Sequence, residues 1–258
     1  MAKAYLVGAG PGDPRLLTIA AAQAIMSADV VLCDRLVSDE IVALAKPSAQ
    51  IIYVGKHPGE QAVMQAKIFD HFLQYASQNK VLVRLKGGDP YIFGRGSEEY
   101  ISLKQLGYDV SIVPGISSAI GVPALAGIPL TARGVSAAFA VVTGHCCGDQ
   151  KVSWAKFAQI DTLVVLMGVG ERVSIAGELI AGGRDPLEPI AFVENGSTAS
   201  QRVVRSTLGS VANGMVEVSS PAIFIVGAVT QLYEQWQDVH FDAPLHQLCQ
   251  TLEEKLSA

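Results

Sequence analysis

Residues 4–13 of the chain read AYLVGAGPGD, a short apolar run that stops at once in a glycine-rich turn. The run Ala4–Val7 carries no charge and little polar alternation, which predicts a buried strand of a parallel sheet. The turn after it matches only half of a dinucleotide-binding fingerprint, because Asp13 stands where the third glycine belongs. Pro11 also lacks the backbone N–H that a phosphate would need. The stretch therefore predicts a strand followed by a close backbone approach to a ligand, and it disfavours NAD and ATP.

The same pattern recurs along the first half of the chain. Further apolar runs predict buried strands at Val30–Cys33, Gln50–Val54, Lys80–Leu85 and Asp109–Val113. Helix candidates alternate with them, at Thr18–Ala28 with Thr18 as N-cap and at Val63–Ser77. This alternation predicts a mostly parallel sheet that is covered by helices on both faces.

The second half of the chain has a different character. Strands are predicted at Ala137–Thr143, Thr162–Met167, Pro189–Val193, Val203–Ser206 and Ala222–Val226. Glu171–Ala181 is the only long helix predicted among them, and a glycine-bearing turn before Gln201 predicts an antiparallel hairpin. We therefore expect two α/β domains, residues 1–114 with a mostly parallel sheet and residues 115–258 with a mixed sheet and a helical tail from Gln231. The boundary is placed at Pro114-Gly115.

Composition excludes several classes of protein. Of the 258 residues, 50% are hydrophobic and 17% are charged, which is ample material for a core and excludes intrinsic disorder. The net charge of −5 argues against a nucleic-acid partner. No apolar run approaches the ~20 residues of a membrane span, and the first run is too short for a signal peptide, so we expect a cytoplasmic protein. Four cysteines predict free thiols, and His145-Cys146-Cys147 lacks the second pair that a metal site needs.

The ends of the predicted strands in the first half share one feature. Each is followed by glycine or by charged residues, at Gly8, Asp34-Arg35, Gly55-Lys56, Lys86–Asp89 and Pro114-Gly115. The carboxyl ends of parallel strands meet at one edge of a sheet, where α/β proteins bind ligands. Several cationic side chains lie at glycine-rich turns, four of them in the first half of the chain and one after it, namely Arg15, Arg35, Lys56, Arg95 and Arg133. They are either scattered solvated charges or a site for a polycarboxylate or phosphate.

Two turns in this region suggest what would bind. In Lys86-Gly87-Gly88-Asp89-Pro90, two glycines expose bare main chain and Asp89 can pair with a ligand ammonium, which suits an amino-acid-like cationic cofactor. Phe93–Glu98 places Arg95 at a helix start, free to reach into the cleft. A nucleophilic triad is not supported, since the chain has no G-x-S-x-G and its histidines show no triad order.

Taken together, these motifs resemble the tetrapyrrole methylase family over residues 4–229. The matching pieces are Val7–Asp13, Leu16–Thr18, Asp34–Val37, Val54–Lys56, Val83–Gly96, Val113–Ile116, Gly127–Thr131, Val142–His145, Met167-Gly168 and Val193–Gly196. Each piece is weak alone, and their order and spacing carry the resemblance. Asp34–Val37 and Phe93–Glu98 favour the members that methylate uroporphyrinogen III.

The resemblance implies an activity and its participants. S-adenosylmethionine would be the methyl donor, released as S-adenosylhomocysteine, in a cleft between the two α/β domains of a homodimer. Two methyl groups would go to C2 and C7 of uroporphyrinogen III, giving precorrin-2 for siroheme and cobalamin, with no metal. No dehydrogenase and chelatase module precedes the matching region, so we expect the reaction to stop at precorrin-2.

The resemblance also implies roles for individual residues. The cofactor-site positions would be Pro11, Gly87, Gly88, Asp89, Ile92, Ser117, Ser118, Met167 and Gly196. Asp34 and Lys56 would be proton acceptor and donor, with Arg95 as a rival catalytic group. Arg95, Glu98, Arg133 and Met167 would bind the tetrapyrrole, whose eight carboxylates account for arginines in an acidic protein. Ser117-Ser118 depart from a common Thr-Ala, a small change that should preserve backbone contacts.

Other readings remain open. Within the family, a methylase acting at another precorrin carbon is the closest alternative, and members acting on diphthine or ribosomal RNA are less favoured. From another class, the chain could bind the cofactor without catalysis. The presence of Asp34, Lys56, Arg95 and Arg133 together argues against that reading.

Overall fold

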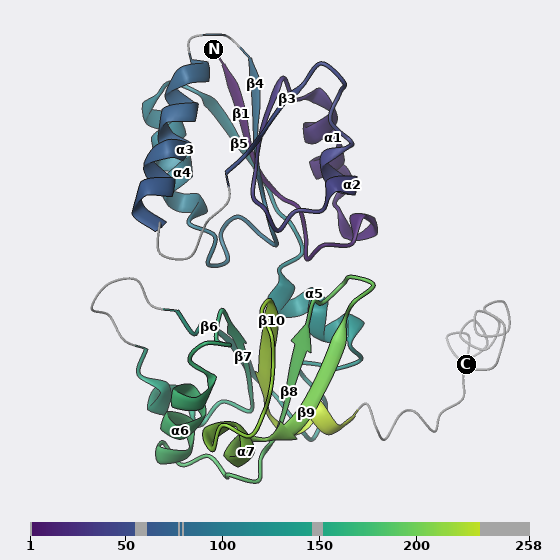
Figure 1. The fold of residues 1–258 in the computed structure, drawn as a ribbon, viewed down its shortest axis with the longest axis vertical. Helices are drawn as coiled ribbons and strands as arrows, with labels where there is room; N and C mark the ends of the chain where they lie inside the picture. The colour runs from purple at the N-terminus through teal and green to yellow at the C-terminus, as the bar shows by residue number, and fades with distance from the viewer. Residues whose placement is uncertain (1, 55–60, 77, 79, 146–151, 233–258) are drawn as a thin grey trace, which may run out of the picture.

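The structure is a computed structural model that describes residues 2–54, 61–76, 78, 80–145 and 152–232. These residues form two α/β units that follow one another along the long axis of the molecule (Figure 1). The α/β class and the change from a parallel to a mixed sheet are as the sequence predicts.

The first sheet has five parallel strands in the order β3-β2-β4-β1-β5. The strands are β1 (Lys3–Gly8), β2 (Val30–Cys33), β3 (Gln50–Tyr53), β4 (Val81–Lys86) and β5 (Asp109–Val113). Every predicted strand is present, within one residue at either end. The prediction of full burial is wrong for β3 and β5, which lie at the two edges of the sheet and are partly exposed.

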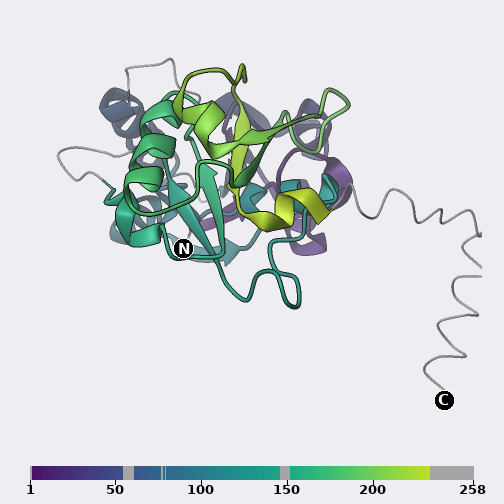
Figure 2. The same ribbon diagram turned by 90° about the horizontal axis from the view of Figure 1, so that it is seen from below.

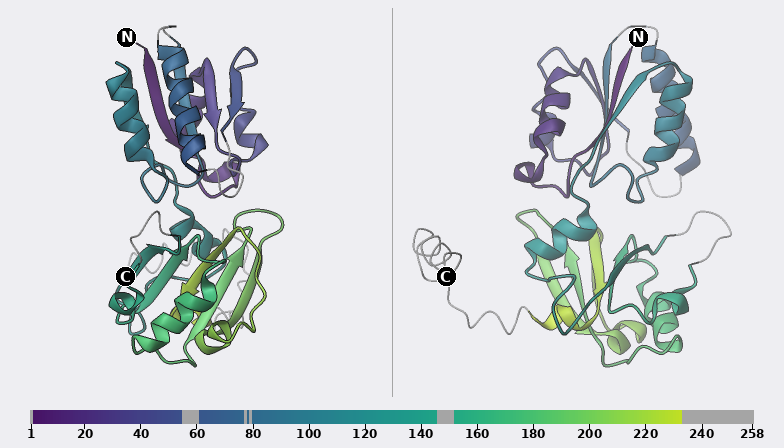
Figure 3. Two further views of the ribbon diagram at one scale, coloured as in Figure 1. Left: turned by 60° about the vertical axis from the view of Figure 1, so that its left-hand side comes forward. Right: turned by 180° about the vertical axis from the view of Figure 1, so that it is seen from behind.

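Helices cover both faces of this sheet (Figures 1 and 3). They are η1 (Pro14–Leu16), α1 (Ile19–Ser27), α2 (Asp39–Val42), α3 (Gln61–Ala76) and α4 (Gly96–Gln105). Thr18 caps α1 by accepting the backbone N–H of Ala21 on its Oγ1, as predicted. Ile25 of α1 packs on one face of the sheet, while Phe72 of α3 and Leu103 of α4 pack on the other.

The second sheet is mixed, in the order β6-β7-β10-β8-β9. Its strands are β6 (Phe139–Thr143), β7 (Thr162–Leu166), β8 (Pro189–Glu194), β9 (Arg202–Thr207) and β10 (Ala222–Val226). β6 and β7 are parallel, and β10 runs antiparallel between β7 and β8. The predicted hairpin is confirmed, because β8 and β9 pair antiparallel with Glu194 opposite Arg202.

Helices also cover both faces of the second sheet. They are α5 (Ser118–Leu125), η2 (Trp154–Phe157), α6 (Arg172–Ala181), α7 (Leu208–Ala212) and η3 (Ala228–Gln231). Leu179 of α6 and Val211 of α7 pack on one face, and Val122 of α5 and Val229 of η3 on the other. The sequence predicted α6 but not α5. The predicted helical tail lies outside the described residues beyond 232.

The two units face each other across the ends of their strands. The carboxyl ends of the first sheet point toward the second unit, where the β8–β9 turn and the start of α5 lie nearest (Figures 1 and 3). Figure 2, seen from below, shows the second unit in front of the first. The chain passes between them from Val113 to Ser118. Among the described helices, none combines the length and the apolar character needed to cross a membrane.

Candidate functional site

Three loops at the carboxyl edge of the first sheet touch through bare main chain. A Cβ atom built on Gly115 would lie 2.3 Å from the carbonyl oxygen of Gly88 and 2.7 Å from the Cα of Gly8. One built on Gly8 would lie 2.5 Å from the same oxygen. Side chains at Gly8 and Gly115 would therefore force apart the loops that follow β1, β4 and β5.

The loop after β4 also pairs with the loop after β1. The N–H of Gly88 donates to the carbonyl of Gly10 at 2.7 Å, and the N–H of Gly10 donates back to Gly88 at 3.2 Å. A Cβ built on Gly87 would meet only the Cβ of Leu36, at 3.6 Å. The main chain of Gly87 is therefore open on the side away from these contacts, where a ligand can lie against it.

The carboxylate of Asp89 holds two of these loops together. Its Oδ1 accepts the N–H of Tyr91 at 2.8 Å, and its Oδ2 accepts the N–H of Gly115 at 3.2 Å. We expected this side chain to face a ligand ammonium. Each of its oxygens accepts one backbone N–H, so Asp89 also shapes the edge, and its pairing with a ligand ammonium stays a prediction.

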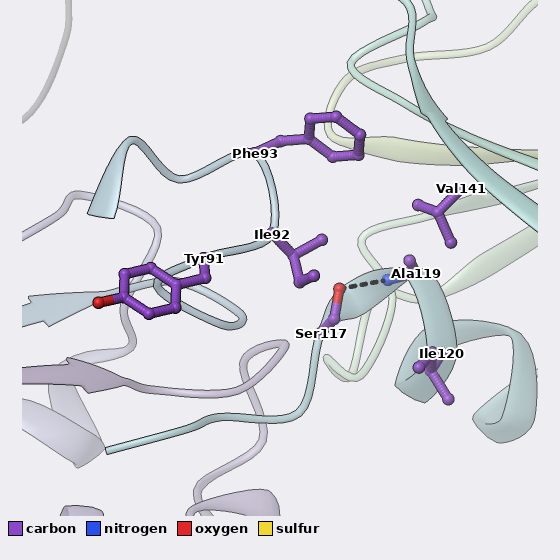
Figure 4. A pocket seen from close by; sticks show the side chains of 7 residues that line it. All are labelled: Tyr91, Ile92, Phe93, Ser117, Ala119, Ile120 and Val141. Carbon is purple, nitrogen blue, oxygen red and sulfur yellow. Dashed lines mark hydrogen bonds between the residues drawn. The ribbon is translucent and has the colours of Figure 1, made fainter. Parts of the chain in front are cut away.

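An apolar pocket of about 230 Å³ lies between the two units (Figure 4). Tyr91, Ile92 and Phe93 line it from the loop after β4. Ser117, Ala119 and Ile120 line it from the start of α5, and Val141 from β6. Of the predicted cofactor positions, Ile92 and Ser117 are in this lining. The other five residues were missed, although the apolar run Tyr91–Phe93 inside a turn was a signal.

The start of α5 gathers further predicted positions. Ser117 caps the helix, its Oγ accepting the N–H of Ala119 at 3.3 Å. A Cβ built on Gly121 would lie 3.5 Å from the Cγ of Pro11, and one built on Gly196 would lie 2.3 Å from a methyl of Val122. Pro11 and Gly196 therefore approach α5 from two segments that are distant in the sequence, next to the cap residue Ser117.

One hydrogen bond joins the β1 loop to the β8–β9 turn. The N–H of Asp13 donates to the Oγ of Ser197 at 3.2 Å. A Cβ on the neighbouring Gly12 would come within 2.9 Å of the same Oγ. The contact fixes the first unit against the second on one side of the pocket.

Backbone strain is concentrated in loops that follow strand ends. Among the described residues, those with positive φ that are not glycine are Phe93, Arg95, Met167, Asn195 and Ser197. They follow the carboxyl ends of β4, β7 and β8. Such conformations cost about 1–3 kcal/mol each and persist where the surroundings impose them, often at functional sites. Met167, a predicted cofactor and substrate position, is 52% exposed at the end of β7.

Asp34 lies directly after β2, and its carboxylate is bound by the buried Arg84 of β4. Its Oδ1 is 2.5 Å from the Nη2 of Arg84. The Nε of Arg84 lies 3.2 Å from Glu99, and the Nζ of Lys86 lies 3.0 Å from the same carboxylate. Burial opposes the charge of Arg84, but Asp34 and Glu99 outweigh it and raise the pKa of Arg84. Burial, reinforced by the charge of Arg84, lowers the pKa of Lys86.

Sequence reasoning missed Arg84 and Glu99 and gave Lys86 no role beyond its turn. The available signal was the run Val81–Lys86, VLVRLK, in which charges interrupt a strand that is otherwise apolar. A charge that is buried in a central strand requires a partner, and Asp34 and Glu99 are those partners.

Arg95 forms an ion pair with Glu98, and its role toward the substrate stays a prediction. It stands at the N-cap of α4 with φ 58°. Its guanidinium binds Glu98 through two hydrogen bonds, of 2.9 Å and 2.5 Å. Arg95 thereby lowers the pKa of Glu98. Arg15 is likewise paired, with Asp13 at 2.7 Å, and its side chain is exposed.

The remaining predicted positions are not gathered in the same way. Arg133 lies in an exposed turn between Ala132 and Ser136, and none of the described hydrogen bonds joins it to Arg95 or Glu98. Lys56 lies in residues 55–60, outside the described ranges. Within the ranges that are described, no group of three or more His, Cys, Asp or Glu side chains is arranged to hold a metal ion.

Comparison with known proteins gives the family of the chain. A structure of the Thermus thermophilus uroporphyrin-III C-methyl transferase, complexed with S-adenyl homocysteine, superposes with a TM-score of 0.80 at 46% identity, covering 90% of this chain and 94% of that one. The uroporphyrinogen-III C-methyltransferase of Methanocaldococcus jannaschii is 41% identical over 237 residues, 90% of this chain and 98% of its own.

A third relative is longer. Siroheme synthase 2 of Yersinia enterocolitica is 46% identical over 231 residues, which are 89% of this chain and 49% of that protein. The chain thus spans about half the length of the siroheme synthases that it matches. The family model for tetrapyrrole (corrin/porphyrin) methylases matches residues 3–212. This chain belongs to the tetrapyrrole (corrin/porphyrin) methylase family.

Proposed function

We propose that this protein transfers methyl groups from S-adenosylmethionine to C2 and C7 of uroporphyrinogen III. The product is precorrin-2, an intermediate of siroheme and cobalamin synthesis. The observation that carries the proposal is the similarity along 90% of the chain to a uroporphyrin-III C-methyl transferase that was solved with S-adenyl homocysteine. The pocket between the two units supports it, because a methyl donor and a macrocycle must meet in one cleft.

The residues of the pocket fit the methyl donor. Its apolar lining, which includes Ile92 and Ile120, suits the flat adenine ring, and the open main chain at Gly87 suits an extended amino-acid tail. The positions that would hold it are Pro11, Gly87, Gly88, Ile92, Ser117, Ser118, Met167 and Gly196, with Asp89 shaping the loops. When bound, S-adenosylmethionine supplies an electrophilic methyl group on its sulfonium.

The protein's own side chains align the ring carbon, hold the substrate and take up a proton. Ile92, Phe93 and Ile120 exclude water from the place where the two reactants meet. Arg95, held by Glu98, and Arg133 bind carboxylates of the tetrapyrrole. Holding both reactants in one geometry lowers the entropic part of the barrier.

Proton removal completes the methylation. Asp34 lies at the carboxyl edge with its side chain 29% exposed, so it can accept the proton that the methylated ring releases. Lys56 is proposed as the proton donor, and Arg95 is the rival for the basic role. The cycle runs twice, through a monomethylated intermediate.

The state and location of the protein are also proposals. We propose a homodimer in the cytoplasm that has no nucleic-acid partner, in keeping with a net charge of −5. We place the domain boundary at residue 114, since β5 ends at Val113 in the first sheet and α5 packs on the second. Light scattering coupled to size-exclusion chromatography would give twice 27.2 kDa for the dimer.

Anaerobic incubation with uroporphyrinogen III and S-adenosylmethionine, followed by mass spectrometry, tests the activity. The wild type should add two methyl groups, and a reaction without S-adenosylmethionine should add none. Asp34→Ala should lose the second methylation or both. Transfer to no tetrapyrrole, or only to a later precorrin, would contradict the proposal.

A further inference from the structure

Arg84 occupies a position in β4 where an apolar residue is the ordinary choice. Its neighbours in the strand are Val83 and Leu85, both fully buried, and Arg84 itself is 2% exposed. All three of its nitrogens are engaged. Nη2 contacts Asp34 at 2.5 Å, Nε contacts Glu99 at 3.2 Å, and Nη1 donates to the carbonyls of Leu32 at 3.3 Å and Leu85 at 3.0 Å.

Glu99 and Lys86 hold this guanidinium in place. Alternate residues of a strand share a face, so Lys86 lies on the same side of β4 as Arg84. The Nζ of Lys86 is 3.1 Å from Oε1 and 3.0 Å from Oε2 of Glu99, whose side chain is 1% exposed. Two cations and two carboxylates therefore balance in charge, and the only member with substantial exposure is Asp34, at 29%.

Stability alone does not account for such a cluster. The cost of removing charges from water commonly cancels the attraction between them, and apolar residues of similar volume often serve as well or better. What the cluster provides is a fixed position for its one exposed carboxylate. In the part of the chain that the structure describes, the Oδ2 of Asp34 receives no hydrogen bond, so it can accept a proton while Oδ1 is held.

We propose that Arg84 is a positioning residue, which holds the carboxylate of Asp34 at the edge of the cleft while Glu99 and Lys86 fix the guanidinium. The inference rests on the proposed function, in which Asp34 takes the proton that the methylated macrocycle releases. Glu99 follows Glu98 in the first turn of α4, and Glu98 binds Arg95. The same cluster therefore ties the proton acceptor to the turn that carries Arg95.

A set of variants tests the proposal, each assayed anaerobically for kcat and KM and titrated with S-adenosylhomocysteine. Arg84→Met should lower kcat by about 100-fold, the effect of misplacing a reacting group by an ångström. Its KM and its affinity for S-adenosylhomocysteine should change less than threefold. Arg84→Lys should have a higher kcat than Arg84→Met, since lysine keeps the positive charge but lacks the several N–H donors of the guanidinium. Arg184→Met is the matched control, because it removes a buried arginine that pairs with Glu188 in the second unit, and it should keep kcat.

The decisive comparison is between the kcat of Asp34→Asn and the kcat of the double variant that carries both Asp34→Asn and Arg84→Lys. If Arg84 acts through Asp34, the double variant should be no slower than Asp34→Asn alone. Losses that multiply, or an Arg84→Met enzyme with wild-type kcat, would overturn the inference and leave the proposed function intact. If the activity of Asp34→Asn is too low to detect, the kcat of Arg84→Lys tests the inference instead. A kcat of Arg84→Lys that is no higher than that of Arg84→Met would overturn the inference. A wild type that transfers no methyl group would end the proposed function and the inference with it.

Discussion

Gly8, Gly88 and Gly115 touch through their main chains, and the shape of the carboxyl edge depends on the missing side chains. The atoms that a Cβ on Gly115 would meet belong to the backbone of Gly88 and Gly8, which cannot swing away as the end of a side chain can. The glycine pattern in the sequence predicted a close approach, and the structure shows that the protein's own loops make it.

Gly115→Ala should lower the free energy of unfolding by about 1–3 kcal/mol, the usual cost of overpacking, and should weaken binding of S-adenosylhomocysteine. Gly177→Ala is the control, because a Cβ at Gly177 meets nothing within 4 Å and the residue lies inside α6. It should raise the free energy of unfolding by about 0.5–1 kcal/mol. Urea unfolding measures both, and a Gly115→Ala protein as stable as wild type would contradict the packing account.

Single-residue roles were the least predictable part of the site. Asp89 and Arg95 were predicted to face ligands, which stays a prediction. The structure adds partners that the sequence did not show, two backbone N–H groups for Asp89 and the carboxylate of Glu98 for Arg95. Local sequence does not show which donor will reach a side chain from another loop. The pairing of Arg84 with Asp34, which is 50 residues away, was out of reach for the same reason.

The β8–β9 hairpin carries an ion pair with two hydrogen bonds. Glu194 is 4% exposed and binds Arg202 opposite it with two hydrogen bonds, of 2.6 Å and 2.8 Å, and it accepts the N–H of Ser219 at 2.7 Å. These bonds, that to Arg202 first, lower the pKa of Glu194 below its ordinary 4.5. The carboxylate form is therefore favoured by folding.

The lowered pKa of Glu194 determines how the stability of the protein depends on pH. The contribution of Glu194 is complete above pH 4.5, where the unfolded carboxyl is also ionised, and it is lost as pH falls through the lower folded pKa. Glu194→Gln should thus be less stable than wild type at pH 6, and the gap should narrow below pH 4.5. Thermal unfolding from pH 3 to 6 measures this, with exposed Glu171→Gln as control. A gap that does not change with pH would refute the assignment.

The turn of the same hairpin contacts the first unit. Ser197→Ala removes the acceptor for the N–H of Asp13 and should weaken binding of S-adenosylhomocysteine about threefold to tenfold, as expected for one hydrogen bond. Ser200→Ala, exposed on the same turn, should bind like wild type. Calorimetric titration compares them, and equal affinities for both variants would show that this contact does not support the pocket.

Elements were far more predictable than their contacts. All ten strands that the structure describes were predicted from apolar runs, which are continuous in the central strands because both faces are buried. The helix α5 was missed, since Ser118–Leu125 contains a glycine and a proline that argue against a helix locally. The cap at Ser117 and the packing of Val122 on the second sheet override that local preference.

At the scale of the whole molecule, function depends on two sheet edges that face each other. Neither unit alone forms the pocket, because Ile92 and Phe93 come from the first and Ile120 and Val141 from the second. Composition does not predict this arrangement, and the net charge of −5 does not show that arginines lie at the ends of the strands. The order of the motifs supplied the family, and the family model agrees over residues 3–212.

The central claim is that this cleft methylates two defined carbons of one macrocycle. The most direct test is anaerobic turnover of uroporphyrinogen III with S-adenosylmethionine that carries ¹³C in its methyl group, followed by carbon NMR of the product. The account predicts label in two methyl groups, attached to C2 and C7. Label at any other ring carbon, or no labelled tetrapyrrole at all, would contradict it.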